Sequence, residues 1–180
     1  MALPHLRPTR SLAVGAVLLT SVLLVSGCSA ILGPQEAQRD EPGGEVTAAS
    51  DADVFSLQIG DCVNQVAADA EQPTDSDDYE EVSSMPVVPC GDPHTDELYA
   101  EKELEAGDYP GDEAIASLTE EFCLAEFEGF VGLSYEESSL DIWPMLPVQV
   151  GWETDDDRVV QCFITAGTEP TTGSLKGSAI

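Results

Sequence analysis

Five cysteines constrain the fold of this chain more than any other residue type. They are Cys28, Cys62, Cys90, Cys123 and Cys162. In an exported protein an odd number leaves one thiol without a disulfide partner. No two cysteines have C-x-x-C spacing, which argues against a redox dithiol or a zinc knuckle. We therefore expect two disulfides and a separate role for one cysteine.

The first 27 residues have the three parts of a bacterial signal peptide. Arg7 and Arg10 form a basic start, and the uncharged apolar run of residues 12–25 is shorter than the roughly 20 residues that span a bilayer. The stretch 24–28, Leu-Val-Ser-Gly-Cys, has the form of a lipobox. Acylation and cleavage are therefore predicted at Cys28. An uncleaved membrane anchor, or an ordinary signal peptide followed by a chance cysteine, is the alternative.

Acidic residues dominate the chain after the leader. Thirty-five acidic and four basic residues remain once residues 1–27 are removed, which gives a formal charge of −31. Such a chain repels nucleic acid and anionic lipid head groups. We therefore predict no nucleic-acid partner, and attachment to the outer face of the bacterial cytoplasmic membrane only through acyl chains on Cys28. The charge suits basic partners or divalent cations, or simply keeps the domain soluble.

Composition divides the mature chain into three parts. Residues 28–52 hold the acylated cysteine and a flexible tether rich in proline, glycine and charge. Residues 53–168 are predicted to fold as one extracytoplasmic domain. Residues 169–180 form a flexible tail with little to bury.

The first half of the domain shows strand patterns and an acidic loop. Apolar residues alternate with polar ones at Phe55, Leu57 and Ile59, which predicts a half-buried strand. Residues 82–90 contain two prolines and are predicted to be an edge strand or an extended segment. Residues 98–104 favour a strand over a short helix. Seven of the thirteen residues 69–81 are acidic, but they lack the glycine and glutamate spacing of a calcium loop.

The second half predicts one long helix and a hairpin. Residues 110–128 carry an apolar stripe and follow Asp108, a candidate cap. The stripe is Ile115, Leu118, Phe122, Ala125 and Phe130, and Cys123 and Phe127 widen it. Residues 148–152 and 160–164 alternate around an acidic turn, which indicates two hairpin arms. The predicted class is α+β: a small antiparallel sheet with one main packed helix and two disulfides.

Four cysteines allow three disulfide pairings. We favour Cys62–Cys90, which closes the acidic loop, and Cys123–Cys162, which ties the helix to the last strand. Because only about 115 residues build the core and their charges repel, the disulfides are expected to matter for stability.

Few residues offer catalytic chemistry. His94 is the only histidine after the leader, and the chain has no nucleophile elbow, no H-E-x-x-H motif and no phosphate-binding glycine loop. We therefore predict no catalytic residue, no metal site and no cofactor. His94 could hydrogen-bond the turn beside a disulfide, make a pH-sensitive contact, or act as a general base with nearby carboxylates.

Five short stretches, taken in order, resemble the septum formation family of actinobacterial envelope proteins. They begin with residues 55–62, FSLQIGDC, and 87–94, VVPCGDPH, followed by Glu97 and Tyr99. The others are residues 107–111, GDYPG, 135–140, YEESSL, and 172–177, TGSLKG. The resemblance covers about residues 53–177. It implies a membrane-attached extracytoplasmic domain connected with septation, and it implies no reaction. Family members often have a transmembrane segment where this chain has a lipobox.

We therefore expect a non-catalytic, lipid-anchored binding or scaffolding module in cell-envelope or septum assembly, with envelope or division proteins as partners. The candidate contact region is His94 and Asp92 with Tyr135 and Trp143. One alternative is a cell-wall-acting enzyme that uses His94 and nearby carboxylates. Another is a lipoprotein that binds a cation or a solute.

Overall fold

A computed structural model describes residues 35–64, 82–167 and 169–180. These residues belong to a unit that spans residues 33–180. The signal peptide, Cys28 and the acidic stretch 69–81 lie outside the described residues, so what the sequence predicts for them remains a prediction. None of the helices in the described ranges is long and apolar enough to cross a membrane.

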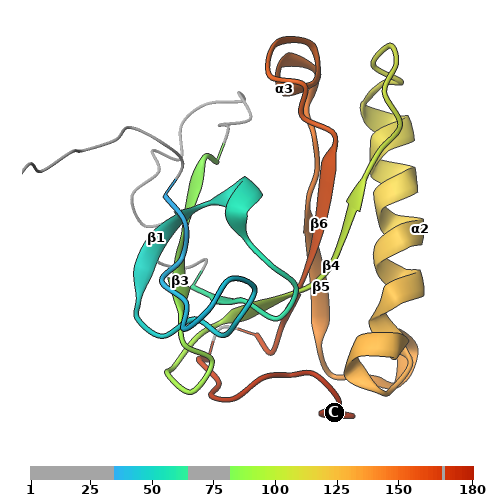
Figure 1. The fold of residues 1–180 in the computed structure, drawn as a ribbon. Coiled ribbons are helices and arrows are strands. Elements are labelled where there is room, and N and C mark those ends of the chain that lie inside the picture. Colours follow the sequence, from blue (N-terminus) through green and yellow to red (C-terminus); the bar gives the residue numbers. More distant parts are fainter. Residues whose placement is uncertain (1–34, 65–81, 168) are drawn as a thin grey trace, which may run out of the picture. The chain divides into compact units, whose positions relative to one another are not determined.

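The described residues form one antiparallel sheet with a long helix packed on it (Figure 1). The sheet order is β1-β3-β2-β4-β6-β5. The strands are β1 (Ser50–Asp53), β2 (Cys62–Val63), β3 (Ser84–Val88), β4 (Asp96–Glu103), β5 (Asp141–Met145) and β6 (Val159–Thr165). The helices are α2 (Asp112–Val131) and α3 (Gln149–Thr154), with 3₁₀ turns η1 (Val54–Ser56) and η2 (Tyr135–Glu137). The predicted α+β class is confirmed.

The central strands β4 and β6 are buried on both faces. Because side chains alternate along a strand, neighbouring residues enter different cores. Tyr99 and Ile164 pack with Phe127 of α2, whereas Leu98 and Phe163 pack with the core formed by the first half of the domain. Figure 1 shows the same division, with α2 along β4, β5 and β6 and with β1 and β3 on the other side.

The long helix agrees with the prediction in place and differs from it in detail. It begins after Gly111, which makes no side-chain cap, so the expected cap at Asp108 is wrong. Cys123 and Phe127, which widen the predicted stripe, lie at the centre of the buried face, so the face is rotated slightly and Leu118 is 46% exposed. The buried residues of the helix are Ile115, Thr119, Cys123, Phe127, Phe130 and Val131. Gly132, with a positive φ of 86°, ends the helix in the left-handed conformation.

Both favoured disulfides are present. Cys62–Cys90 joins β2 to the turn after β3, and its Cα atoms are 5.2 Å apart. Cys123–Cys162 joins α2 to β6 across the core, with a Cα–Cα distance of 5.6 Å. The second bridge fixes which face of the helix meets the sheet.

The folded region begins before the predicted boundary at residue 53. β1 pairs with β3, and the backbone N–H of Thr47 donates to the Gln38 carbonyl at 2.8 Å. The tether prediction is therefore wrong for residues 35–52. The predicted strand at 55–59 is also wrong. Phe55 lies in η1, capped by the Asp53 carboxylate, and both Phe55 and Ile59 are more than half exposed.

The edge-strand prediction for residues 82–90 is wrong, because β3 has partners on both sides. It pairs with β1 and with β2. Pro86 removes one donor from the ladder, but its carbonyl still accepts the Asn64 N–H at 3.1 Å.

The hairpin prediction is correct for its second arm only. Residues 159–165 form β6, and residues 96–103 form β4, as the preferred strand interpretation predicted. The first arm is wrong, because residues 149–154 form the short helix α3, in which Trp152 is buried and Val150 is 57% exposed. β6 pairs instead with β4 and β5.

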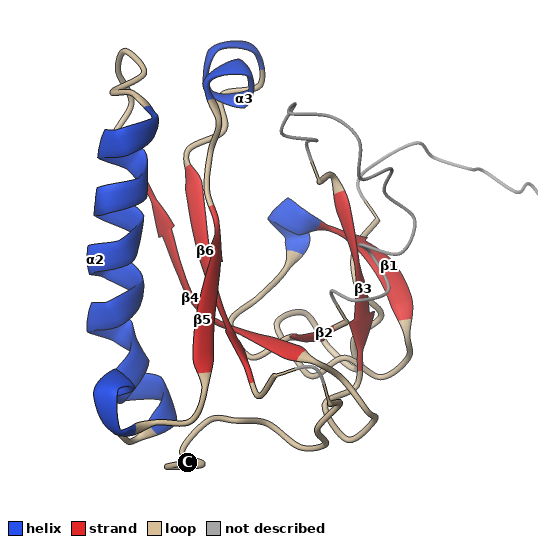
Figure 2. Cartoon of the chain, turned by 180° about the vertical axis from the view of Figure 1, so that it is seen from behind, coloured by secondary structure: helices blue, strands red, loops and turns tan. Residues whose placement is uncertain are grey.

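The predicted flexible tail packs on the domain. Thr171 and His94 exchange two backbone hydrogen bonds of 2.8 and 3.0 Å. Further along, the N–H groups of residues 177 and 179 donate to carbonyls at the end of α2. These bonds satisfy carbonyls that a helix end leaves without intrahelical partners. Leu175 is 4% exposed in the core under α2, and Figure 2 shows this segment running to the lower end of that helix.

Candidate functional site: the recess beside the Cys62–Cys90 disulfide

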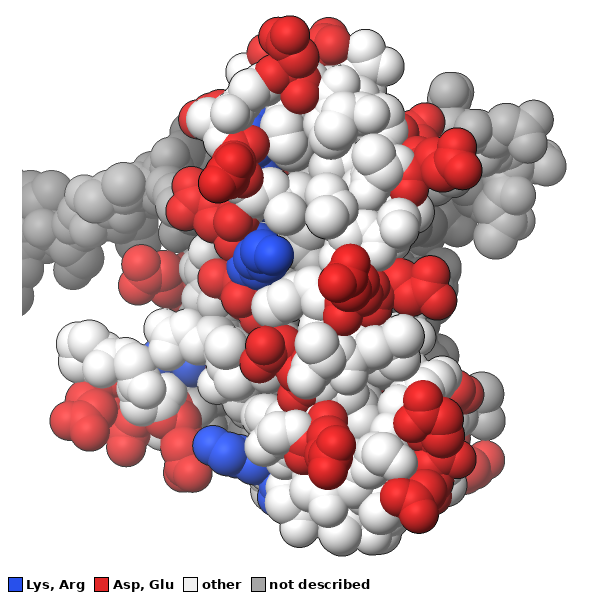
Figure 3. All heavy atoms as spheres, turned by 90° about the vertical axis from the view of Figure 1, so that its right-hand side faces the viewer, with Lys and Arg blue, Asp and Glu red and all other residues white. Residues whose placement is uncertain are grey.

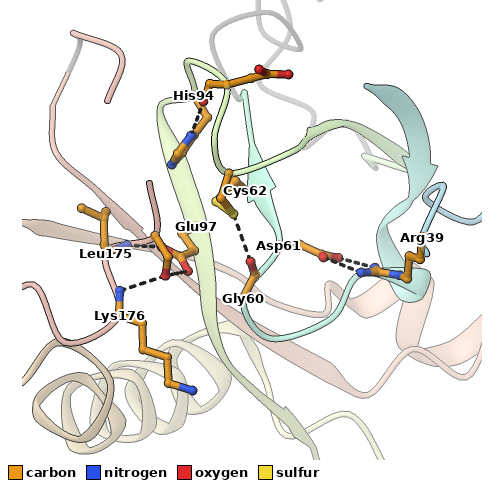
Figure 4. Close-up of a disulfide and its surroundings, with 11 residues drawn as sticks. Arg39, Gly60, Asp61, Cys62, His94, Glu97, Leu175 and Lys176 are labelled. Atoms are coloured by element: carbon orange, nitrogen blue, oxygen red, sulfur yellow. Dashed lines mark hydrogen bonds and ion pairs between the residues drawn. A yellow bond between two sulfur atoms is a disulfide. The ribbon is translucent and has the colours of Figure 1, made fainter. Parts of the chain in front are cut away.

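A recess of about 340 Å³ opens beside the first disulfide. Segments far apart in the sequence meet there: residues 43–46, the loop 58–61, the turn 89–91 and the C-terminal tail. We call it the disulfide recess. Its charged lining groups include Arg39, Asp61, Glu97 and Lys176. Figure 4 shows these four side chains around the disulfide.

Glu97 is a fully buried carboxylate. β4 places it opposite Cys62 on one side and Ile164 on the other. Its two oxygens accept hydrogen bonds from the Ser174 hydroxyl and the Leu175 backbone N–H, each at 2.6 Å (Figure 4). Burial raises the pKa of Glu97, while these two bonds and the nearby His94 and Lys176 act in the opposite direction. Glu97 therefore fastens the tail to the sheet.

Asp61 and Arg39 form a bidentate ion pair at the opposite wall. The two guanidinium–carboxylate distances are 2.7 and 2.6 Å, and Asp61 is 3% exposed. Asp61 also accepts the Gln58 backbone N–H at 2.8 Å. The hydrogen bonds that Arg39 donates to Asp61 raise the pKa of Arg39. Because bidentate pairs are geometrically specific, this pair holds the N-terminal segment against the loop 58–61.

His94 is the residue on which an enzymatic interpretation depends, and it has no exposed surface. Its Nδ1 lies 2.9 Å from the Asp92 carbonyl. A carbonyl only accepts, so Nδ1 carries a proton and donates it to this bond. Nε2 has no partner among the described residues. A group in this position cannot reach a substrate outside the domain, which argues against a general-base role.

One of the four predicted contact residues, His94, is fully buried and contributes no surface. The His94 ring is hydrogen-bonded to the backbone carbonyl of Asp92. Trp143 is half-buried: its indole N–H donates to Asp96 at 2.7 Å, and its ring stacks on Phe163 at 4.4 Å. Tyr135 packs edge-on against a phenyl ring of α2 and donates to Asp141 at 3.3 Å. These aromatic residues contribute to the packing of the domain, and the contact region remains a prediction.

A metal centre is not formed by the described groups around the disulfide. A sulfur from each of Cys62 and Cys90 and an oxygen of Glu97 lie within 4.8 Å of one another. Thiolates bind metals, and the sulfurs of a closed disulfide are not thiolates.

On the face that Figure 3 shows, acidic side chains outnumber lysines and arginines. In the described part of the chain the ion pairs are Arg39–Asp61 and Arg158–Asp156, so Lys102 and Lys176 pair with no described carboxylate. Their amines lie over phenyl rings of α2, Lys102 at 5.3 Å from Phe122 and Lys176 at 5.9 Å from Phe130. Lys176 lines the disulfide recess and Lys102 does not.

Sequence reasoning missed the groups that build this recess. Glu97, Asp61 and Arg39 look like other charged residues of a highly acidic chain, and the strand pattern gave no sign that Glu97 points inward. Their burial depends on the tail and the N-terminal segment, both of which were predicted to be flexible.

Comparison with protein-family models, with curated proteins and with solved structures finds no match to this chain. The resemblance to the septum formation family therefore remains an expectation from the sequence.

Proposed function

We propose that the chain is a non-catalytic lipoprotein, held at the outer face of the bacterial cytoplasmic membrane by acyl chains on Cys28. It acts there as a binding module in envelope or septum assembly, and its binding site is the disulfide recess. Confinement to a surface raises the effective concentration of such a module for membrane-associated partners.

The observation that carries the proposal is the preorganisation of the recess. The Cys62–Cys90 bridge, the Arg39–Asp61 pair and the Glu97–tail bonds hold its walls in place. A rigid, concave site binds with little ordering cost. Lys176 is an exposed cation at this site, and no described carboxylate pairs with it.

Charge reversal at Lys176 tests the proposal. In cells that lack the native gene, Lys176→Glu is expected to fail to restore the wild-type division or envelope phenotype. Lys102→Glu is the matched control, because Lys102 is also exposed, stacks on a phenyl ring and lies outside the recess. Equal rescue by the two variants, at equal protein levels, would contradict the proposed site.

The enzymatic alternative is tested at His94. His94→Asn keeps a side-chain N–H that can donate to the Asp92 carbonyl and removes the imidazole. The binding-module proposal expects this variant to rescue the phenotype. Loss of rescue by a variant that still folds would favour the enzyme.

A further inference from the structure

A second recess, of about 500 Å³, lies between the loop that precedes α2 and the helix α3. It shares no lining residue with the disulfide recess. We call it the aromatic recess. Six of its lining residues carry the argument: Asp108, Tyr109, Gln149, Trp152, Glu153 and Arg158.

The floor of the aromatic recess is a fixed stack. The Arg158 guanidinium lies over the Trp152 ring at 3.8 Å and donates to the Trp152 and Asp157 carbonyls at 2.8 and 2.7 Å. The indole N–H of Trp152 donates to the Gly107 carbonyl at 2.8 Å. Tyr109 packs edge-on against the same indole at 5.6 Å and is half-buried, so part of its ring faces the opening.

Arg158 retains hydrogen-bonding capacity that the described chain does not use. The residue is 9% exposed, and its Nε, which has no partner among the described residues, is itself buried, so only the remaining edge of the guanidinium is open to a ligand. Its Nη2 pairs at 2.9 Å with Asp156, whose side chain is 87% exposed. The Asp156 carboxylate is open to water, so a ligand oxygen can compete with it for Nη2.

Two carboxylates, which accept hydrogen bonds, also line the aromatic recess. Asp108 and Glu153 are exposed and line the recess. Glu153 receives one hydrogen bond, from the Gln149 amide at 2.8 Å. An ionised carboxylate accepts about four hydrogen bonds and donates none, so these groups call for a ligand with donors.

We propose that the aromatic recess binds a carbohydrate. A sugar hydroxyl donates and accepts, so adjacent hydroxyls serve a carboxylate and the guanidinium edge together. The exposed part of the Tyr109 ring offers an apolar surface for the C–H face of a sugar ring. A few convergent polar groups around such a surface are typical of small-molecule sites.

Charged ligands fit the aromatic recess less well. An anion could accept from Arg158 but would meet Asp108 and Glu153. A cation could pair with those carboxylates, but it would lie beside a guanidinium that already covers the Trp152 ring.

The test is an NMR titration of the full mature chain with the indole N–H of Trp152 as reporter. The chain has two tryptophans, so Trp143→Phe identifies the signal. The probes are chitotriose and maltotriose, with spermidine as a cationic and citrate as an anionic comparison. At least one trisaccharide is expected to shift the Trp152 signal in a saturable way at physiological salt, and citrate is not.

Matched variants separate binding at this recess from a general effect. Glu153→Gln keeps shape and removes one acceptor, so trisaccharide binding should weaken by about tenfold, the value of one hydrogen bond to a charged group. Glu121→Gln removes the same charge from the exposed face of α2 and should leave binding unchanged. Tyr109→Ala should abolish the saturable shift.

Three results would overturn the assignment: no shift with either trisaccharide, equal weakening by Glu153→Gln and Glu121→Gln, or a larger saturable shift with spermidine or citrate than with the sugars. Because Lys176 lies outside this recess, any of these results would leave the test of the disulfide recess unaffected.

Discussion

Replacement of Glu97 tests how the C-terminal tail is held. Glu97→Ala removes both acceptors and leaves the Leu175 N–H buried without a partner, whereas Glu97→Gln can preserve both bonds. The glutamine carbonyl can accept from Leu175, and its amide can donate to the Ser174 hydroxyl oxygen. Glu97→Gln therefore keeps the side-chain volume and both bonds, whereas Glu97→Ala loses the bonds and the buried volume together.

The difference in the free energy of unfolding between the two variants follows from the burial of Glu97 and from its hydrogen bonds. Hydrogen bonds to a charged group contribute about 1.5–3 kcal/mol each. Burial of the carboxylate costs several kcal/mol and offsets much of that gain. The free energy of unfolding of Glu97→Ala should therefore be lower by about 2 kcal/mol than that of Glu97→Gln, a figure of the size expected for a buried unpaired donor.

The raised pKa of Glu97 also sets the direction in which the stability changes with pH. The folded-state pKa of Glu97 is raised above 4.5 by burial. A raised pKa contributes stability that is fully present below the unfolded-state pKa and is lost as pH rises through the folded-state pKa. Wild type should therefore gain stability relative to Glu97→Gln as the pH is lowered through that range.

Urea unfolding of the mature chain at several pH values measures both effects, and hydrogen exchange at the Leu175 amide reports on the tail itself. Glu97→Ala should lose protection at that amide while Glu97→Gln keeps it. Equal stability of the two variants, or a wild-type advantage over Glu97→Gln that grows with rising pH, would refute the reasoning about Glu97.

Three further predictions concern the disulfides, the lipid anchor and Tyr109. Reduction should lower the melting temperature, because each bridge closes a loop of 28 or 39 residues and contributes about 3–4 kcal/mol through the unfolded chain; an unchanged thermal transition after verified reduction would contradict this. Cys28→Ala should move the protein from the membrane to the soluble fraction without changing the melting temperature, and retention in the membrane would argue against acylation. Burial, with help from Asp112, raises the pKa of Tyr109 to about 12, so the stability that Tyr109 contributes should be complete below about pH 10 and lost as pH rises toward 12. Alkaline unfolding of wild type and Tyr109→Phe checks this, and identical alkaline profiles would count against it.

The pattern of apolar residues in the sequence predicted the elements in which buried positions recur regularly. The helix at residues 112–131 has one buried face over several turns, so its periodicity is visible in the sequence. The strand β6 is buried on both faces and is visible as a nearly continuous apolar run. The two disulfides follow from their places relative to those elements. Rotation of the helix stripe could not be predicted, because it depends on where Cys123 meets Cys162.

Short alternating runs misled the prediction where tertiary contacts decide the structure. Val148, Val150 and Trp152 alternate by coincidence, and Trp152 is placed instead by Arg158 and by the Gly107 carbonyl. The tail and the segment before residue 53 have few apolar residues, so nothing local predicts that they pack. Their order comes from backbone hydrogen bonds and from Glu97 and Asp61, which no pattern distinguishes from the exposed acids.

Photocrosslinking in living cells tests the central claim that the disulfide recess receives a partner. A photoreactive residue at Ile59, which is 58% exposed and lines the recess, is compared with one at Leu118, which is 46% exposed on α2. The binding-module proposal expects a discrete crosslinked partner from position 59 that is lost with Lys176→Glu and kept with Lys102→Glu. The same crosslinks from positions 59 and 118, or a position-59 crosslink that survives Lys176→Glu, would contradict it.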